Sequence, residues 1–223
     1  MNATTPPLES DLHRLRDHYD LLARHHGYGP EASQMSSLAS QEQRLRVLAE
    51  IVREPDASVL DFGCGTGHLC EVLRRDAGFR GRYTGYDLSG ESLALARARH
   101  AGAHFEQRDI FRDGVGHHFD YAIISGVFNN RVTDNWAFLT GALRTLFPHV
   151  RRGLAFNALS AYVDFQDAGL YYADPADVFR FCKESLSPAV NLRHDYEVKP
   201  GVVPFEFTTQ VFRCAHAPRA KHA

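Results

Sequence analysis

The sequence has no excess of basic residues. Its 25 lysine and arginine residues are slightly outnumbered by 27 aspartate and glutamate residues, which gives a formal net charge of -2. Proteins that bind polyanions carry a basic patch, arm or stripe, and no such run occurs here. The composition therefore argues against nucleic acid as a partner.

Long apolar runs are also missing. The longest have the length of a β-strand, whereas a membrane-spanning helix needs about 20 apolar residues. The N-terminal segment MNATTPPLESDLHRLRDHYD does not resemble a signal peptide, because no apolar stretch follows a basic region. We expect a soluble cytoplasmic protein without a membrane partner, and no feature of the sequence sets an oligomeric state.

Cysteine is scarce, and histidine shows no metal-binding pattern. The cysteines are Cys64, Cys70, Cys182 and Cys214. They show no CxxC pairing, which favours reduced thiols. Among the 13 histidines, His100 and His104 are four apart, but Gly102 lies between them where a helix would end. We therefore predict solvated histidines and no metal site.

What is present is a strand-helix alternation in a chain of 223 residues. We expect residues 1–54 to form a helical cap within the same domain as residues 55–223. Strands are predicted at 58–62, 83–86, 121–125 and 153–156, with AHFEQRDI as the third strand and its turn, and helices at 68–75, 89–100, 134–146 and 176–183. Two strand-like segments, AVNLRHDYEV and FEFTTQVFRC, end the pattern. It predicts an α/β, Rossmann-like open sheet, mostly parallel, with helices on both faces and an antiparallel C-terminal hairpin at its edge.

Three glycines follow the first predicted strand in VLDFGCGTGH. Gly63, Gly65 and Gly67 form GxGxG, whereas a dinucleotide fingerprint is GxGxxG, and a phosphate-binding P-loop would need GxxxxGK. Because glycine has no Cβ atom, a ligand can approach the main chain closely at this strand end. Asp61 lies two residues before the turn, where a carboxylate suits a ligand with an ammonium group.

Two further carboxylates follow the next strands. Asp87 comes about 20 residues after the glycine turn, at the distance of the carboxylate that binds ribose hydroxyls in nucleoside-binding α/β folds. Asp109 follows the third strand, where a carboxylate can accept from an adenine amino group. Each also has a plain structural interpretation, as a strand-end cap for Asp87 and a turn aspartate for Asp109.

The ordered segments VLDFGCGTG, YTGYDLS, FEQRDI and FDYAIISGVF resemble the motifs of class I S-adenosylmethionine-dependent methyltransferases. The resemblance implies that S-adenosylmethionine is the cofactor. It places the glycines at the methionine portion, Asp61 near its amino group, Asp87 on the ribose, Asp109 at the adenine, and Ser125 near the sulfonium. The cofactor-binding residues it implies are Asp61, Gly63, Gly65, Gly67, Asp87, Leu88, Asp109, Ile110 and Ser125.

The acceptor side is less constrained, because displacement at a sulfonium depends mainly on positioning. Asn129 and Asn130 follow the fourth strand and are candidate catalytic residues, or an Asn-rich turn. Tyr171 and Tyr172 precede the 176–183 helix, and aromatic faces can surround a cation. Packing beneath a loop is the alternative for these tyrosines.

We therefore expect methyl transfer to a small-molecule acceptor. The LYYADP segment looks like that of a subgroup of small bacterial methyltransferases, but a second asparagine follows FN and the stretch before LYYADP is shorter. These departures suggest an alternative, a cyclase that converts the cofactor into azetidine-2-carboxylate and methylthioadenosine. A non-catalytic S-adenosylmethionine-binding protein is the third possibility.

Overall fold

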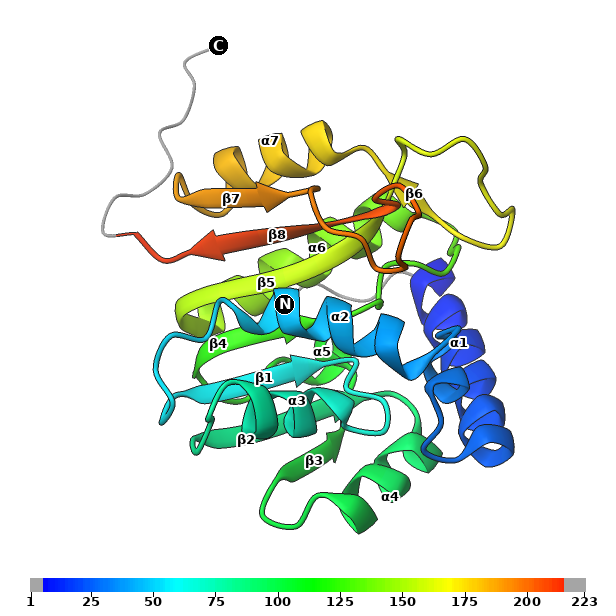
Figure 1. Ribbon diagram of the computed structural model, residues 1–223, viewed down its shortest axis with the longest axis vertical. Helices are drawn as coiled ribbons and strands as arrows, with labels where there is room; N and C mark the ends of the chain where they lie inside the picture. Colours follow the sequence, from blue (N-terminus) through cyan, green and yellow to red (C-terminus); the bar gives the residue numbers. More distant parts are fainter. Residues whose placement is uncertain (1–5, 215–223) are drawn as a thin grey trace.

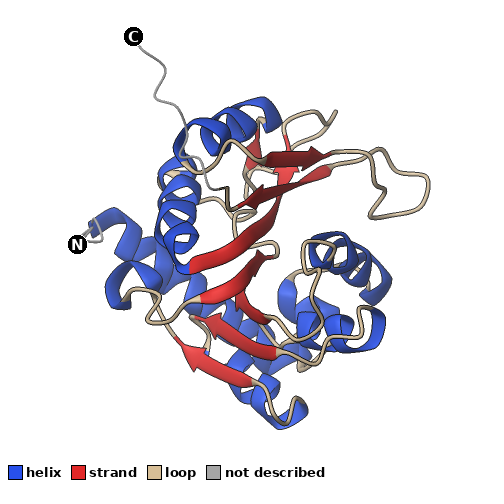
Figure 2. Ribbon diagram, turned by 90° about the vertical axis from the view of Figure 1, so that its left-hand side faces the viewer, coloured by secondary structure: helices blue, strands red, loops and turns tan. Residues whose placement is uncertain are grey.

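The computed structural model describes residues 6–214, which form an open sheet of eight strands with helices on both faces (Figures 1 and 2). The strands are β1 (Ser58–Phe62), β2 (Arg82–Asp87), β3 (His104–Gln107), β4 (Phe119–Ile124), β5 (Val150–Ser160), β6 (Tyr172–Ala173), β7 (Val190–Arg193) and β8 (Glu206–Phe212). The helices are α1 (Pro6–His26), α2 (Leu38–Ala49), α3 (His68–Asp76), α4 (Gly90–Arg99), α5 (Ile110–Asp113), α6 (Asn135–Leu146) and α7 (Pro175–Ser185). Two short 3-10 helices are η1 (Pro30–Ser33) and η2 (Phe147–His149).

The strand order is β3-β2-β1-β4-β5-β8-β7, with β6 paired to the end of β5. β1 to β5 pair in parallel, and β8 runs antiparallel to both β5 and β7. The predicted fold class is confirmed. The two C-terminal strands do pair with each other, but β8 lies inside the sheet and β7 forms the edge. The reason is burial, since β8 is buried along almost its whole length whereas β7 is not.

The strands at the centre are buried on both faces. Val59 and Ile123 belong to a core that packs against α2, α3 and α4, whereas Leu60 and Ile124 belong to a second core with α6 and α7. Successive strand residues point to opposite faces, so a near-continuous apolar strand is what two helical layers require.

Side-chain caps begin four helices close to the predicted positions. They are Ser37, Ser89, Asp134 and Asp174, each of which accepts a hydrogen bond from a backbone N–H in the first turn. Two details differ from the sequence prediction. β5 is longer than the predicted 153–156 strand, and it extends far enough to pair with the unpredicted β6.

The first two helices occupy different positions. α1 lies across the side of the sheet toward which β1 and β3 run, and it contacts η1 and α4 (Figure 1). α2 instead packs on a face of the sheet, against α3 and β5. The cap over the strand ends is therefore built from α1 and η1. A division of the chain at residues 54 and 55 stays a prediction.

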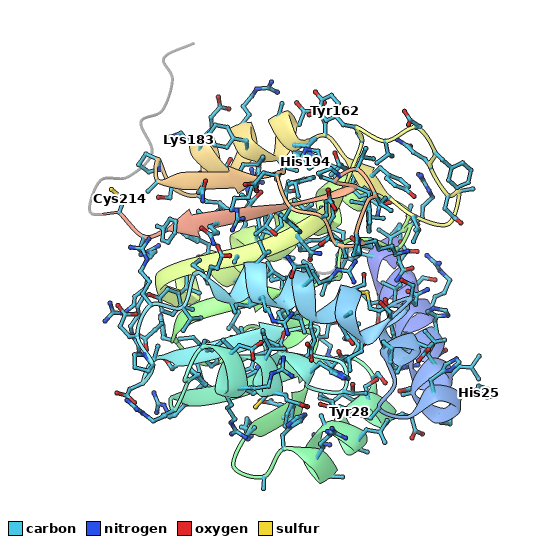
Figure 3. The ribbon with its side chains drawn as sticks, in the orientation of Figure 1. His25, Tyr28, Tyr162, Lys183, His194 and Cys214 are labelled. Carbon is cyan, nitrogen blue, oxygen red and sulfur yellow. The ribbon has the colours of Figure 1, made fainter. Side chains whose placement is uncertain are left out.

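Two further observations concern the cysteines and the lengths of the helices. None of the four cysteines, all of which lie among residues 6–214, forms a disulfide, and Cys214 is exposed near the end of β8 (Figure 3). Within the same described range, no helix combines the length and the apolar character needed to span a membrane.

The strand order makes a testable prediction about hydrogen exchange. Backbone amides of residues 207–211 in β8 should exchange more slowly than those of residues 190–193 in β7, because β8 is hydrogen-bonded on both sides. Native-state exchange followed by mass spectrometry or NMR measures both segments in one sample. Equal protection of the two strands would contradict an internal β8.

Candidate functional site

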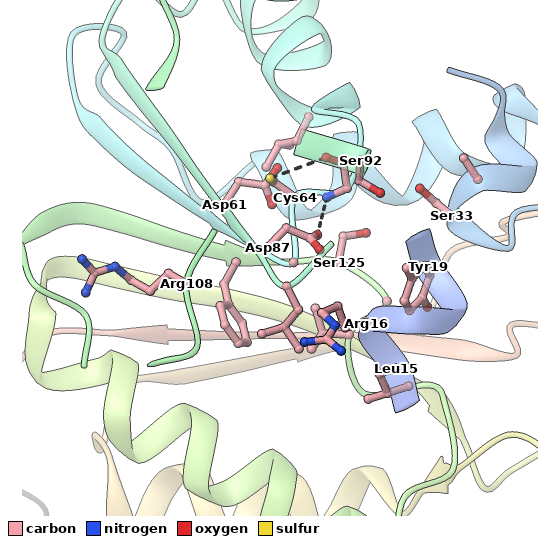
Figure 4. A pocket seen from close by; sticks show the side chains of 18 of the residues that line it. Leu15, Arg16, Tyr19, Ser33, Asp61, Cys64, Asp87, Ser92, Arg108 and Ser125 are labelled. Atoms are coloured by element: carbon pink, nitrogen blue, oxygen red, sulfur yellow. Dashed lines mark hydrogen bonds between the residues drawn. The ribbon is translucent and has the colours of Figure 1, made fainter. Parts of the chain in front are cut away.

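A pocket opens at the carboxyl ends of the parallel strands, beneath α1 (Figure 4). Its empty volume is about 1110 Å³, part of which is open to solvent. The residues predicted to bind a cofactor that line it are Asp61, Gly63, Gly65, Asp87, Leu88, Asp109, Ile110 and Ser125. Gly67 is absent from this lining. It is the residue before α3, and a Cβ atom there would lie 2.8 Å from the His100 ring.

The glycine turn is fixed against the end of β2. The amides of Gly63 and Cys64 both donate to the carbonyl of Tyr86, at 2.8 and 3.0 Å. Gly63 has a φ of +75°, and a Cβ atom there would lie 2.2 Å from Cγ2 of Val127. A side chain at this position would therefore be strained and would clash with the pocket floor.

Asp87 ties the turn to the next strand. One carboxylate oxygen accepts from the Gly65 amide at 2.7 Å, and the other accepts from the Ser89 amide at 2.8 Å. Burial raises the pKa of Asp87, and the backbone hydrogen bonds oppose that rise. A carboxylate has about four lone-pair sites. The carboxylate therefore keeps acceptor capacity for a ligand hydroxyl.

Asp61 is the second buried carboxylate of the pocket, with only 2% of its surface exposed. Burial raises its pKa to about 7, although the hydrogen bond donated by the Tyr83 hydroxyl lowers it. The charge of Asp87 adds to the rise. Near neutral pH this carboxyl is close to half ionised, and a ligand cation beside it would favour the ionised form.

The opposite end of the pocket is apolar, with one carboxylate. Asp109 caps the short helix α5 by accepting from the Phe111 amide at 2.9 Å. The hydrogen bond that this side chain makes in the structure is therefore a local one, of the kind expected for an aspartate in a turn. The same residue still lines the pocket, next to Leu88 and the buried Ile110. Apolar side chains and one carboxylate therefore line this part of the pocket.

Sequence reasoning missed the residues that cover the pocket. Arg16 and Tyr19 of α1 approach it from the side opposite the sheet, and Ser33 faces the glycine turn (Figure 4). Met35 and Gln41 complete this wall, and Oε1 of the buried Gln41 has no hydrogen-bond partner. Tyr19 belongs to the apolar stripe of its helix, but no local spacing indicates which site that stripe covers.

The predicted catalytic residues lie near one another but outside the pocket lining. The Tyr171 amide donates to the carbonyl of Asn129 at 2.8 Å, which joins the two segments. Asn130 donates through Nδ2 to the hydroxyl of Tyr19 at 2.8 Å, so it holds a pocket residue in place. The hydroxyl of Tyr172 accepts from the Asp167 amide. A direct catalytic role for the four stays a prediction.

Two histidines contradict the prediction of solvated rings. His68 and His100 are each only 7% exposed, and Tyr28 of the cap segment packs against both rings. Tyr28 stacks on His68 at 4.2 Å between ring centroids, and its hydroxyl lies 2.7 Å from Nε2 of His100. Burial lowers the pKa of both imidazoles. Within residues 6–214, no group of three or more histidine, cysteine, aspartate or glutamate side chains could hold a metal ion.

These features together define a class of protein. An open, mostly parallel sheet, a glycine turn after β1 and a buried carboxylate at the end of β2 are the elements of a nucleoside-binding Rossmann-like fold. The GxGxG spacing sets it apart from dinucleotide-binding dehydrogenases.

Comparison with known proteins identifies the family. A family model described as a methyltransferase domain matches residues 53–154. The chain is 38% identical over 164 residues to "Putative methyltransferase Rv1506c" of Mycobacterium tuberculosis, an alignment covering 69% of this chain and 92% of the relative. The chain belongs to the class I S-adenosylmethionine-dependent methyltransferases.

Solved structures share the fold at low sequence identity. Magnesium protoporphyrin IX methyltransferase from Synechocystis, solved with bound S-adenosylmethionine, superposes with a TM-score of 0.64 at 16% identity, over 96% of this chain and all of that one. The plantazolicin methyltransferase BpumL gives 0.60 at 12% identity, over 92% and 98%. These likenesses concern the fold alone.

The buried Asp61 makes a prediction about stability. A carboxyl whose pKa is raised on folding stabilises the fold at low pH, and that contribution is lost as pH rises from about 4 to 7. Asp61→Asn should therefore raise the Tm of the ligand-free protein at pH 8, with the gain shrinking toward pH 5. A gain of 1 kcal/mol corresponds to about 2–4 °C. Calorimetry across this range tests it, and a lower Tm for the variant at pH 8 would show that the ionised carboxylate is well solvated.

Proposed function

We propose that this chain transfers a methyl group from S-adenosylmethionine to a small-molecule acceptor, and that the cofactor occupies the pocket beneath α1. The observation that carries the proposal is the burial and the orientation of the Asp87 carboxylate. Its carboxylate is buried and is oriented by two backbone amides, with acceptor capacity left on the side of the pocket. A ribose has two adjacent hydroxyls, which would donate hydrogen bonds to this carboxylate.

The other pocket residues follow from this anchor. Leu88 and Ile110 would enclose the adenine, with Asp109 at its amino group. The methionine portion would run along Gly63 and Gly65, where a Cβ atom would narrow the pocket. Its ammonium would lie at Asp61, and the unpartnered Oε1 of Gln41 is a further acceptor on that side. The residues present therefore fit the cofactor of the family.

The floor of the pocket indicates what kind of acceptor reacts. Bound S-adenosylmethionine would supply an electrophilic methyl group, to which a lone pair on the acceptor would bond as the sulfur leaves with S-adenosylhomocysteine. Ser125 and Val127 of the floor, and Met35 and Tyr19 of the wall that faces it, are uncharged, and burial raises the pKa of Tyr19 to about 12. With no ionised base among these four, we propose an acceptor whose reacting atom carries a free lone pair at neutral pH. Orientation and exclusion of water then provide the catalysis.

A small acceptor is supported by the cover over the pocket. α1 and η1 lie across the strand ends, so a bulky folded partner would have to displace them to reach the floor. The net charge of -2 gives no general attraction to a polyanion. Among the solved neighbours, one is a methyltransferase of magnesium protoporphyrin IX, and BpumL was solved with an analogue of plantazolicin.

The first experiment incubates the protein with S-adenosylmethionine alone and follows the products by mass spectrometry. We expect the cofactor to remain intact, and S-adenosylhomocysteine to form only when an acceptor from a small-molecule panel is added. Formation of methylthioadenosine together with an amino acid of cyclised mass would instead establish a cofactor-consuming cyclase. Binding without turnover across the whole panel would favour a non-catalytic protein.

Asp87→Ala tests the placement of the cofactor. Each hydrogen bond to a charged group contributes about 1.5–3 kcal/mol. Loss of the bonds to both ribose hydroxyls should therefore weaken binding at least about 100-fold. Titration calorimetry measures the affinity, and circular dichroism checks the fold. Asp177→Ala, on the exposed surface of α7, is the matched control and should bind normally. Wild-type affinity in Asp87→Ala would refute the ribose assignment.

The affinity for the cofactor should also depend on pH through Asp61. Its pKa of about 7 means that protonation removes the negative charge as pH falls below neutrality. Binding of an ammonium-bearing ligand should weaken by up to about tenfold per pH unit below that point. The Asp61→Asn variant should bind more weakly at pH 7.5 and lose most of this dependence between pH 5.5 and 7. A parallel slope in both proteins would place the ammonium elsewhere.

A further inference from the structure

A buried ion pair lies behind the pocket and outside its lining. Arg44 of α2 and Glu206 of β8 approach to 3.0 Å between Nη2 and Oε2, with side chains that are 6% and 0% exposed. A buried pair of this kind gains little stability over apolar side chains of similar size. The other hydrogen bonds that Arg44 and Glu206 make therefore indicate which neighbouring residues the ion pair orients.

Asn157 of β5 connects the ion pair to the pocket floor. Its Nδ2 donates to Oε1 of Glu206 at 3.2 Å, and its Oδ1 accepts from the Gly126 amide at 2.8 Å. A carboxylate paired with Arg44 can only accept hydrogen bonds, so it requires the amide nitrogen of Asn157 to face it. The amide oxygen must then point at Gly126, which directly follows Ser125.

A second connection reaches the same place through the cap. Nη1 of Arg44 donates to the sulfur of Met35, a residue of the pocket wall. The methyl carbon of Met35 lies 3.4 Å from where a Cβ atom on Gly126 would be. Gly126 has a φ of +73°, so the turn that carries Ser125 has a backbone conformation that side-chain-bearing residues rarely adopt. Both partners of the ion pair thus reach this turn.

The carboxylate has a third partner, which contacts the same oxygen as Asn157. The Tyr196 hydroxyl lies 3.2 Å from Oε1 of Glu206 and 2.8 Å from Oγ1 of Thr208. This arrangement fixes the position of Glu206 independently of Asn157. It also provides a nearby bond, between Tyr196 and Thr208, that can be removed without touching the connection to Gly126.

We propose that Glu206 is a positioning residue for methyl transfer, which sets the Ser125–Gly126 turn at the pocket floor by fixing the amide orientation of Asn157. The proposal rests on the proposed function, in which this turn faces the reacting end of the cofactor. It assigns a role in the site to a strand, β8, that contributes no residue to the pocket lining.

The test uses two kinds of variant and one control. Asn157→Leu removes the connection but leaves the ion pair intact, and Asn157→Ser is the fallback if the leucine variant does not fold. The double variant Arg44→Met with Glu206→Met removes both charges, so no unpaired charge is buried. Thr208→Val is the matched control, because it pairs with Asn157 across the strands and loses a hydrogen bond of the same buried cluster, yet it keeps the hydrogen bonds of Asn157 to Glu206 and Gly126.

Two measurements report on position rather than on stability. The first is the NMR signal and exchange rate of the Gly126 amide in the ligand-free protein. The second is the affinity for S-adenosylmethionine by calorimetry. In the Asn157 variants and the double variant, we expect a shifted Gly126 signal, exchange about tenfold faster, and affinity reduced about tenfold, the size expected for one lost hydrogen bond. Thr208→Val should keep the wild-type signal and affinity even if its Tm falls.

An unchanged Gly126 signal in the Asn157 variants, or in the folded double variant, would overturn the positioning role. An effect of the same size in Thr208→Val would also overturn it, because the cluster would then act only through stability. The NMR measurement needs no ligand, so it stays informative if the cofactor binds elsewhere. Failure of the proposed function would appear separately, as wild-type binding by Asp87→Ala.

Discussion

A buried carboxylate that accepts backbone hydrogen bonds from two segments organises the end of this pocket that carries the glycine turn. Asp87 lies where β2 ends, and it holds the amide of Gly65 from the turn after β1 as well as that of Ser89 before α4. The turn cannot support itself, because its glycines gain no side-chain contacts and lose much conformational entropy on folding. The strand pairing of β1 with β2 places the partners, and the carboxylate then fixes the turn before any ligand arrives.

Such pre-organisation has an energetic cost that the ligand can offset. Asp61 and Asp87 are both buried, and burial raises the pKa of each. Two like charges in one pocket oppose folding, while a cation or a pair of hydroxyls beside them favours the ionised forms. The pocket is therefore less stable than an apolar one of the same shape would be, and ligand binding should raise the stability of the fold.

Local sequence patterns predicted the central part of this structure well, since β1 and the caps at Ser89 and Asp174 depend on neighbouring residues. The same local patterns indicated every pocket-lining residue that we propose to contact the cofactor except Gln41, because strand ends and glycine turns are local features. The strand order of β8 and the position of α1 depend on which distant surfaces bury them. For the same reason, Gln41 and Tyr19 were missed, and the burial of His100 under Tyr28 was not foreseen.

The internal position of β8 also governs how the protein can be made. Glu206 follows Arg44 by 162 residues, so a nascent chain on the ribosome carries the arginine long before its partner emerges. Until then the β5 edge is open, and Asn157 lacks the carboxylate that its amide nitrogen contacts in the folded protein. Contacts between such distant residues form slowly and leave an exposed strand edge in the meantime. The folded arrangement of the pocket floor is therefore expected only after β8 has been synthesised and has paired with β5.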